Sequence, residues 1–113
     1  MEIITESIAV EKLKEMSEKM FGNIVKAVVD IERGIMAIDG ELHADLEVLL
    51  SDNGSERKNV WGINFHTDAT GDDFVEFDSM INLKPQFGNR TRGVDNEEIR
   101  KKIMEVVNKL VKK

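Results

Sequence analysis

The sequence predicts a two-layer α+β domain: a mostly antiparallel sheet of about five strands, with an N-terminal and a C-terminal helix packed on one face. Apolar residues recur at three- and four-residue spacing near both ends of the chain, and they alternate with polar residues in the middle. The segments between the alternating stretches are too short for parallel crossovers. With 113 residues, of which 41% are hydrophobic and 34% are charged, the chain is expected to form a single domain over residues 1–113.

The first third of the chain is expected to hold one helix and one hairpin. Ser7 is placed to cap a helix that ends before Gly22, a natural helix stop. Residues 23–31 alternate as a strand, and the Glu-Arg-Gly sequence at 32–34 fits a short loop with its glycine in the left-handed conformation. The chain is then expected to return through a second strand at 35–38.

Residues 41–50 fit two different structures. Leu42, Leu46 and Leu49 would share one face of a helix that Gly54 would end. The same segment also alternates strictly between apolar and polar residues from Glu41 to Val48. This alternation, and its place between two other strand candidates, favour a half-buried strand, which we predict.

The remainder of the chain is expected to form two strands and the last helix. Apolar residues alternate with polar ones over 60–66 and 74–83, as in strands with one buried face. Asp95, followed three residues later by Glu98, resembles a capping box at the start of a helix. A broad apolar stripe from Ile99 onward then predicts that this helix is amphipathic and packs on the sheet.

Composition excludes several classes of protein. The absence of cysteine excludes disulfides, Cys-ligated metals and thiol nucleophiles. An acidic N-terminal sequence and the lack of any apolar run near 18 residues indicate a cytoplasmic protein without a membrane segment. A net charge of −6, one Trp and no Tyr argue against a nucleic-acid surface. No phosphate-binding or dinucleotide-binding glycine motif is present, and no feature calls for a cofactor.

The sheet face opposite the helices is the first candidate site. If residues 41–50 form a strand, this face displays histidines and carboxylates on neighbouring strands, where side chains lie close enough to share a metal. The residues predicted as metal ligands are His43, Asp45, His66 and Asp78. The alternative is an ordinary solvated face, because the outer side of an antiparallel sheet is polar by default. That alternative is favoured, since no compact ligand motif is present.

The second candidate site is the loop from Asn82 to Arg92, which holds the only Pro and the only Gln of the chain. Two arginines separated by one residue can grip a phosphate or carboxylate, and the asparagines add hydrogen bonds. The predicted ligand-binding residues are Asn82, Asn89, Arg90 and Arg92.

Charge suggests another role for the same loop. Residues 1–83 carry 7 basic and 18 acidic side chains, whereas residues 84–113 carry 9 basic and 4 acidic ones. Basic residues beside a strongly acidic region usually pair with it. The favoured interpretation is therefore that Arg90 or Arg92 contacts Glu47, Glu76 or Asp78 and locks the loop to the sheet.

Three segments resemble a family of small prokaryotic proteins of unknown function: Glu41-Leu-His-Ala-Asp45, Trp61-Gly-Ile-Asn64 and Ile81-Asn-Leu-Lys-Pro-Gln-Phe-Gly-Asn-Arg-Thr-Arg92. The resemblance runs from about Lys26 through the last helix. The family carries Arg before the proline, where this chain has Lys84, and that difference would weaken a bidentate contact there. The resemblance implies no activity, cofactor or partner.

The sequence favours a small binding or interaction module over an enzyme. Its ligand surface would combine the acidic sheet face with the Arg-containing loop, and a small anionic ligand or a divalent cation is the expected partner. The rival functions are a metal-dependent hydrolase built on the predicted metal ligands, and a homo-oligomeric subunit, such as a homodimer, that pairs through the open sheet face.

Overall fold

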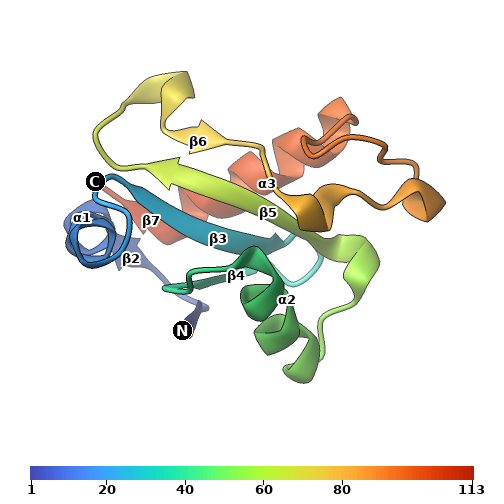
Figure 1. Cartoon of the computed structure of the whole chain (residues 1–113), viewed down its shortest axis with the longest axis horizontal. Coiled ribbons are helices and arrows are strands. Elements are labelled where there is room, and N and C mark those ends of the chain that lie inside the picture. Colours follow the sequence, from blue (N-terminus) through green and yellow to red (C-terminus); the bar gives the residue numbers. More distant parts are fainter.

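The computed structural model describes all 113 residues and has the predicted α+β architecture (Figure 1). The five-stranded sheet has the order β1-β4-β3-β5-β6, and every neighbouring pair is antiparallel. Its strands are β1 (Glu2–Ile4), β3 (Ile24–Asp30), β4 (Ile35–Ile38), β5 (Val60–His66) and β6 (Val75–Glu76). The helices are α1 (Val10–Lys19), α2 (His43–Asp52) and α3 (Glu97–Leu110). A separate parallel pair joins β2 (Ile8–Ala9) to β7 (Val111–Lys112).

Helices α1 and α3 cover one face of the sheet, as predicted. Leu13 and Met16 of α1, and Ile103 and Leu110 of α3, belong to one buried cluster with the apolar residues that the strands direct to this face. Trp61 lies in this cluster and is almost fully buried. Burial of this apolar area is the main favourable contribution to folding, at roughly 25 cal/mol for each Å² removed from water.

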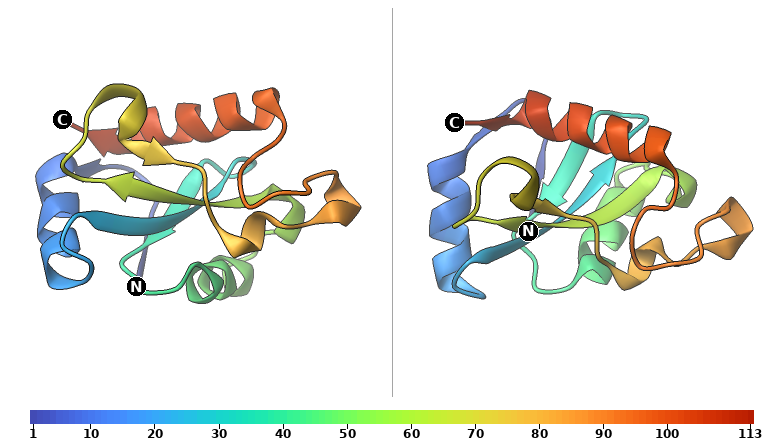
Figure 2. Two further views of the ribbon diagram at one scale, coloured as in Figure 1. Left: turned by 45° about the horizontal axis from the view of Figure 1, so that its top comes forward. Right: turned by 90° about the horizontal axis from the view of Figure 1, so that it is seen from above.

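The predicted strand at 41–50 is wrong, because His43–Asp52 form α2, which lies on the opposite face of the sheet. Figure 2 shows α3 and α2 on the two sides of the sheet. Leu46 and Leu50 of α2 are fully buried against a second cluster that includes Val28, Ala37 and Val60. The face that was expected to be open is therefore partly covered by α2.

Strand order explains why this segment is helical. β4 and β5 both pair antiparallel with β3 and flank it, so they run in the same direction. A chain that leaves β4 must return along the sheet before it enters β5, and such a crossover usually contains a helix. The edge of β4 is already paired with β1, a strand that the sequence analysis missed.

Two helix starts and one strand also differ from the predictions. β6 spans only Val75–Glu76, because the chain then leaves the sheet and forms a 3₁₀ turn at Met80–Asn82. Ala9, with no side-chain hydrogen bond, occupies the cap position of α1 in place of Ser7. The cap of α3 is Asn96, whose Oδ1 accepts from the amides of Glu98 and Ile99.

The left-handed conformation predicted for the glycine of the first hairpin loop is confirmed. Gly34 adopts φ 68° in the turn between β3 and β4, the left-handed conformation that favours glycine.

None of the three α-helices combines the length and the apolar composition that a membrane span requires.

Candidate functional site

The part of the second sheet face that α2 leaves uncovered forms the floor of a hollow of about 500 Å³. We call it the sheet–α2 hollow. The N-terminus of α2 closes one side, and the chain after β6 closes another. Exposed apolar side chains border the hollow, and charged or hydrogen-bonding side chains line it. The apolar ones are Phe21, Leu42 and Met80, and the polar ones are Lys26, His43, Asn64, Glu76, Asp78, Ser79 and Arg92.

His43, the first residue of α2, has a defined tautomer. Its Nε2 lies 2.8 Å from the carbonyl oxygen of Ile63, and because a carbonyl only accepts, Nε2 carries the hydrogen. Burial lowers the pKa of His43, and the Ile63 hydrogen bond opposes that shift only in part. At neutral pH the imidazole is therefore uncharged, and Nδ1 has a free lone pair.

Gly62 makes room for this arrangement. A Cβ atom at Gly62 would lie 3.2 Å from Cδ2 of His43 and 2.5 Å from Cβ of Ser79. Both side chains therefore lie directly on the backbone of β5. The glycine in the Trp-Gly-Ile-Asn sequence thus allows the side chains of His43 and Ser79 to pack closely against the backbone of β5.

Asn64 has one satisfied and one unsatisfied side-chain atom. Its Nδ2 donates to Oε1 of Glu76 at 2.9 Å and to the carbonyl of Asp78 at 3.1 Å. Its Oδ1 is buried and accepts no hydrogen bond. The residue as a whole is 8% exposed and lines the hollow. The pKa of Glu76 is lowered by the Asn64 hydrogen bond first and by the His66 hydrogen bond second. His66 Nε2 lies 3.1 Å from Glu76 Oε1.

Of the contacts expected between the loop arginines and the acidic residues, the one between Arg92 and Asp78 is present. Nε of Arg92 lies 2.9 Å from Oδ1 of Asp78, and both side chains are about half exposed. Arg90 makes no ion pair; its backbone amide donates to Asp95 instead. Asp95, predicted as the helix cap, accepts from that amide and from the Thr91 hydroxyl, and these bonds, Thr91 first, lower its pKa.

Asn82 and Asn89 are buried, and both use their side-chain amides within the chain. Asn82 bonds both backbone groups of Gly62, at 2.8 Å through Oδ1 and 3.0 Å through Nδ2. Nδ2 of Asn89 lies within 3.0 Å of three carbonyl oxygens, and its Oδ1 accepts from the Asp95 amide. These two asparagines fix the shape of the loop.

The sequence analysis missed the role of Lys84. Its side chain is fully buried, and Nζ donates to the carbonyls of Arg57 at 2.7 Å and Val60 at 2.5 Å. The ammonium group also lies 4.2 Å from the ring centroid of Trp61. Burial is the main cause that lowers the pKa of Lys84 to about 8. The feature of the sequence that could have indicated a special role for Lys84 is its position directly before the only Pro.

The four residues predicted as metal ligands do not come together. His43 and Asp78 line the sheet–α2 hollow, whereas His66 pairs with Glu76. Asp45 lies exposed in the first turn of α2 and does not line the hollow. No group of three or more His, Asp or Glu side chains has a geometry that could hold a metal ion.

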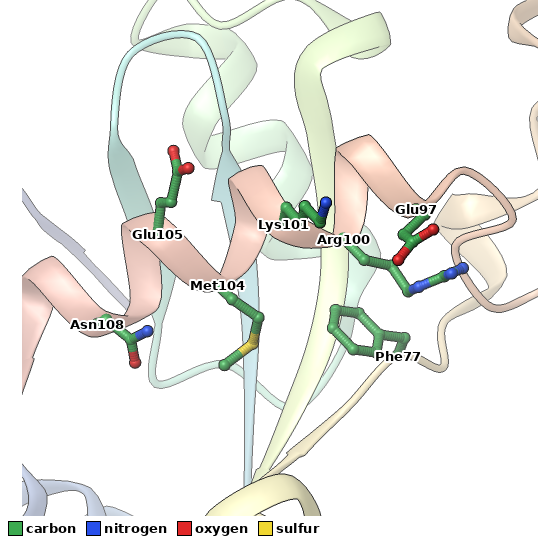
Figure 3. Close-up of a pocket in the computed structure, with 7 residues that line it drawn as sticks. All are labelled: Phe77, Glu97, Arg100, Lys101, Met104, Glu105 and Asn108. Atoms are coloured by element: carbon green, nitrogen blue, oxygen red, sulfur yellow. The ribbon is translucent and has the colours of Figure 1, made fainter.

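Two other hollows lie on the α3 side of the molecule. One, of about 440 Å³, runs along α3 beside Phe77, and Figure 3 shows Phe77 between Met104 and Arg100. It is bordered by exposed helix side chains. A larger one, of about 730 Å³, lies between α1, α3 and the 67–72 loop. Neither contains a buried polar side-chain atom that lacks a hydrogen bond.

Together, the fold and this geometry define a class: a small α+β domain with helices on both sheet faces and a polar hollow beside a helix N-terminus. The chain belongs to the family described as "Protein of unknown function (DUF5674)", whose model matches residues 2–110. Neither a curated protein nor a solved structure matches the chain.

Proposed function

We propose that the protein is a small binding module whose ligand occupies the sheet–α2 hollow. A volume of about 500 Å³ lies within the usual range for small-ligand sites, roughly 300–1,000 Å³. Such sites combine an apolar border with a few polar groups that orient the ligand. Phe21, Leu42 and Met80 would supply the border here, and all three are exposed hydrophobic residues.

The observation that carries this proposal is the lining of the hollow, where three exposed apolar side chains border charged and hydrogen-bonding groups. A small molecule with an apolar part and a polar group would cover that apolar surface and bond those groups.

The loop has an indirect role in this proposal. Arg92 lines the hollow, and its ion pair with Asp78 would hold that carboxylate in place. Asn82 and Asn89 would keep the loop in the shape that positions Arg92. We do not propose a metal-dependent hydrolase, which needs three or four ligands around one point.

The proposal is tested by NMR titration of ¹⁵N-labelled protein with small carboxylic acids, amines and neutral amides. Binding in the hollow should shift the backbone amides of Lys26, Ala44, Asn64 and Met80. If no class of compound shifts these amides at millimolar concentration, or if the shifts map to α3, the proposal is wrong.

A pair of matched variants locates the site. Met80 is 64% exposed and borders the hollow, whereas Val48 is 57% exposed on α2 and lies outside it. Met80→Ala should weaken binding of an apolar fragment about three- to tenfold, because the fragment would lose contact with roughly 25–55 Å² of apolar side-chain area. Val48→Ala should leave the affinity unchanged, and an equal loss in both variants would contradict the proposed location.

A further inference from the structure

The loop before α3 projects as an exposed turn, residues 85–88, which we call the loop tip. The buried residues Lys84 and Asn89 hold its two ends together, because each donates its amide to the carbonyl of the other, at 3.0 and 3.3 Å. Pro85 restricts the backbone, and Gly88 adopts φ 86° with no atom within 4 Å of the position of a Cβ. The loop tip is therefore a fixed turn that reaches into open space at one end of the molecule (Figures 1 and 2).

The loop tip presents an aromatic side chain and lies beside an unpaired charge. Phe87 is 47% exposed and belongs to neither buried cluster. Residues 84–92 include three basic residues and no acidic one. Of these, Lys84 is buried and Arg92 has an ion pair, whereas Arg90 is exposed and has none. A single exposed aromatic residue is common, but one on a fixed turn loses little conformational entropy when it binds.

A partly apolar hollow lies at the other end of the molecule. It is the hollow of about 730 Å³ between α1, α3 and the 67–72 loop, and we call it the α1–α3 hollow. Figures 1 and 2 show α1 and the C-terminus, which border it, at the end opposite the loop tip. Phe74, Met104 and Val111 line it and are only partly buried. Such a volume accepts small ligands, so it has room for an aromatic side chain, which would lie against Phe74.

The charges around the α1–α3 hollow favour a basic partner. The charged side chains in the lining and directly next to it are four acidic and two basic ones: Glu11, Asp68, Asp72, Asp73, Lys14 and Lys113. None of them has an ion pair. Three of the acidic residues belong to the 67–73 loop, which has no basic residue. An arginine that approaches from the side of this loop would therefore meet a net negative charge.

We infer that the loop tip of one copy binds in the α1–α3 hollow of a second copy. Phe87 would lie among the apolar lining residues, and Arg90 would pair with a carboxylate of the 67–73 loop. The two surfaces differ and lie at opposite ends of the molecule, so the contact is heterologous and links copies head to tail. It is small beside the roughly 1,200–2,000 Å² that stable interfaces bury, so we expect weak association. The inference goes beyond the proposed function, because it does not involve the sheet–α2 hollow.

Sedimentation velocity of the whole chain, from about 10 μM to about 1 mM at low ionic strength, tests for this association. The weight-average mass of the wild-type protein should rise with concentration, and added salt should reduce the rise. Phe87→Ser should stay monomeric, whereas Val48→Ala, which truncates another exposed apolar residue, should behave as the wild-type protein. A wild-type protein that is monomeric throughout would overturn the inference, and so would undiminished association of Phe87→Ser.

A mixture of two variants determines which surfaces meet. Ala69→Arg fills the α1–α3 hollow and leaves the loop tip intact, whereas Phe87→Ser does the reverse. Each variant alone should stay monomeric, but an equimolar mixture should form dimers that grow no further, because each pair has one intact tip and one intact hollow. A mixture that stays monomeric would overturn the inference. Thr70→Arg, at an exposed residue of the same lining, replaces Ala69→Arg if urea titration shows that Ala69→Arg is unfolded.

Charge reversal tests the role of Arg90. Arg90→Glu should weaken the association about threefold or more, because an attractive charge pair becomes a repulsive one. Addition of Asp68→Lys and Asp72→Lys to the same chain should restore part of the association, and a further loss would contradict the assigned contact.

Met80→Ala separates this inference from the proposed function. Met80 borders the sheet–α2 hollow and does not line the α1–α3 hollow, so its truncation should leave the association unchanged. A loss as large as that of Phe87→Ser would mean that the loop tip binds in the sheet–α2 hollow, and it would overturn the inference.

Discussion

At the scale of single residues, Gly62 determines where His43 and Ser79 can lie. The side chain of Ser79 occupies the space that a Cβ atom at Gly62 would need, at 2.5 Å from Ser79 Cβ and 2.6 Å from Ser79 Oγ. The imidazole of His43 lies beside it and bonds the Ile63 carbonyl. The floor of the sheet–α2 hollow therefore depends on a residue that has no side chain.

Gly62→Ala is expected to destabilise the protein by about 1–3 kcal/mol, the usual cost of overpacking a filled site. The new methyl group must displace Ser79, whose hydroxyl accepts from the amide of Ile81. The free energy of unfolding, from urea titration of the wild-type and variant proteins, measures this cost.

A double-mutant cycle shows whether the clash with Ser79 is the cause. Ser79→Gly removes the atoms nearest to the new methyl group, so the double variant should lose less stability than the sum of the two single losses. Strict additivity of the two losses would show that Gly62 has a different role.

Asn82 and Asn89 also hold the backbone in this region, through hydrogen bonds of their side-chain amides. β6 pairs with β5 only at Asn64 and Phe65, so Gly62 has no strand partner on that side. The Asn82 amide bonds both its N–H and its C=O and so replaces a neighbouring strand. Sequence analysis predicted that both asparagines bind a ligand, because residue type alone does not distinguish a backbone-binding amide from a ligand-binding one.

At the scale of elements, the two structures that fit residues 41–50, a strand and a helix, would bury different side chains. A strand with the observed alternation would bury Leu42, Leu46 and Val48 on one face. The helix buries Leu46 and Leu50 completely and leaves Leu42 and Val48 more than half exposed. Truncation of these side chains therefore reports which structure forms in solution.

Leu46→Ala and Leu50→Ala are each expected to destabilise the protein by about 2–5 kcal/mol, because each leaves a cavity under α2. Leu42→Ala and Val48→Ala should stay within about 0.5 kcal/mol of the wild-type protein, as exposed substitutions usually do. The four urea midpoints, compared at constant slope, provide the measurement. A large loss in Val48→Ala would favour the strand instead.

Most elements could be predicted from the sequence because each has one buried face with a regular period. α3 and the strands β3, β4 and β5 follow their patterns closely. In α2 the sequence fits both periods, and the choice depends on the return path from β4 to β5, which is a tertiary property. β1 is three residues long and carries no distinctive pattern of its own.

The candidate site was harder to predict, because its parts are distant in sequence. Lys26, His43 and Arg92 come from β3, α2 and the loop before α3, and the crossover through α2 brings them together. Placing residues 41–50 in a strand put His43 and Asp45 on one sheet face. In the helix, only His43 reaches the hollow.

At the scale of the whole molecule, Lys84 joins the loop to the start of β5 through a buried cation. The folded protein lowers the pKa of Lys84 from 10.5 to about 8, mainly through burial. Between those values the unfolded chain holds a proton that the folded chain has released, so stability must rise with pH. A neutral amine still has two hydrogens, which is enough for the carbonyls of Arg57 and Val60.

The stability of the wild-type protein should therefore increase relative to Lys84→Met as the pH rises from about 8 to 10.5. The increase should not exceed about 3 kcal/mol, the limit set by 1.36 kcal/mol for each pKa unit. Urea titrations of both proteins at several pH values measure it, and the titration of all other lysines cancels in the difference. Lys58→Met, which removes a lysine whose side chain is 58% exposed, is the matched control. A flat difference for Lys84→Met, or one that falls with pH, would mean that the folded protein does not disfavour the charged form of Lys84.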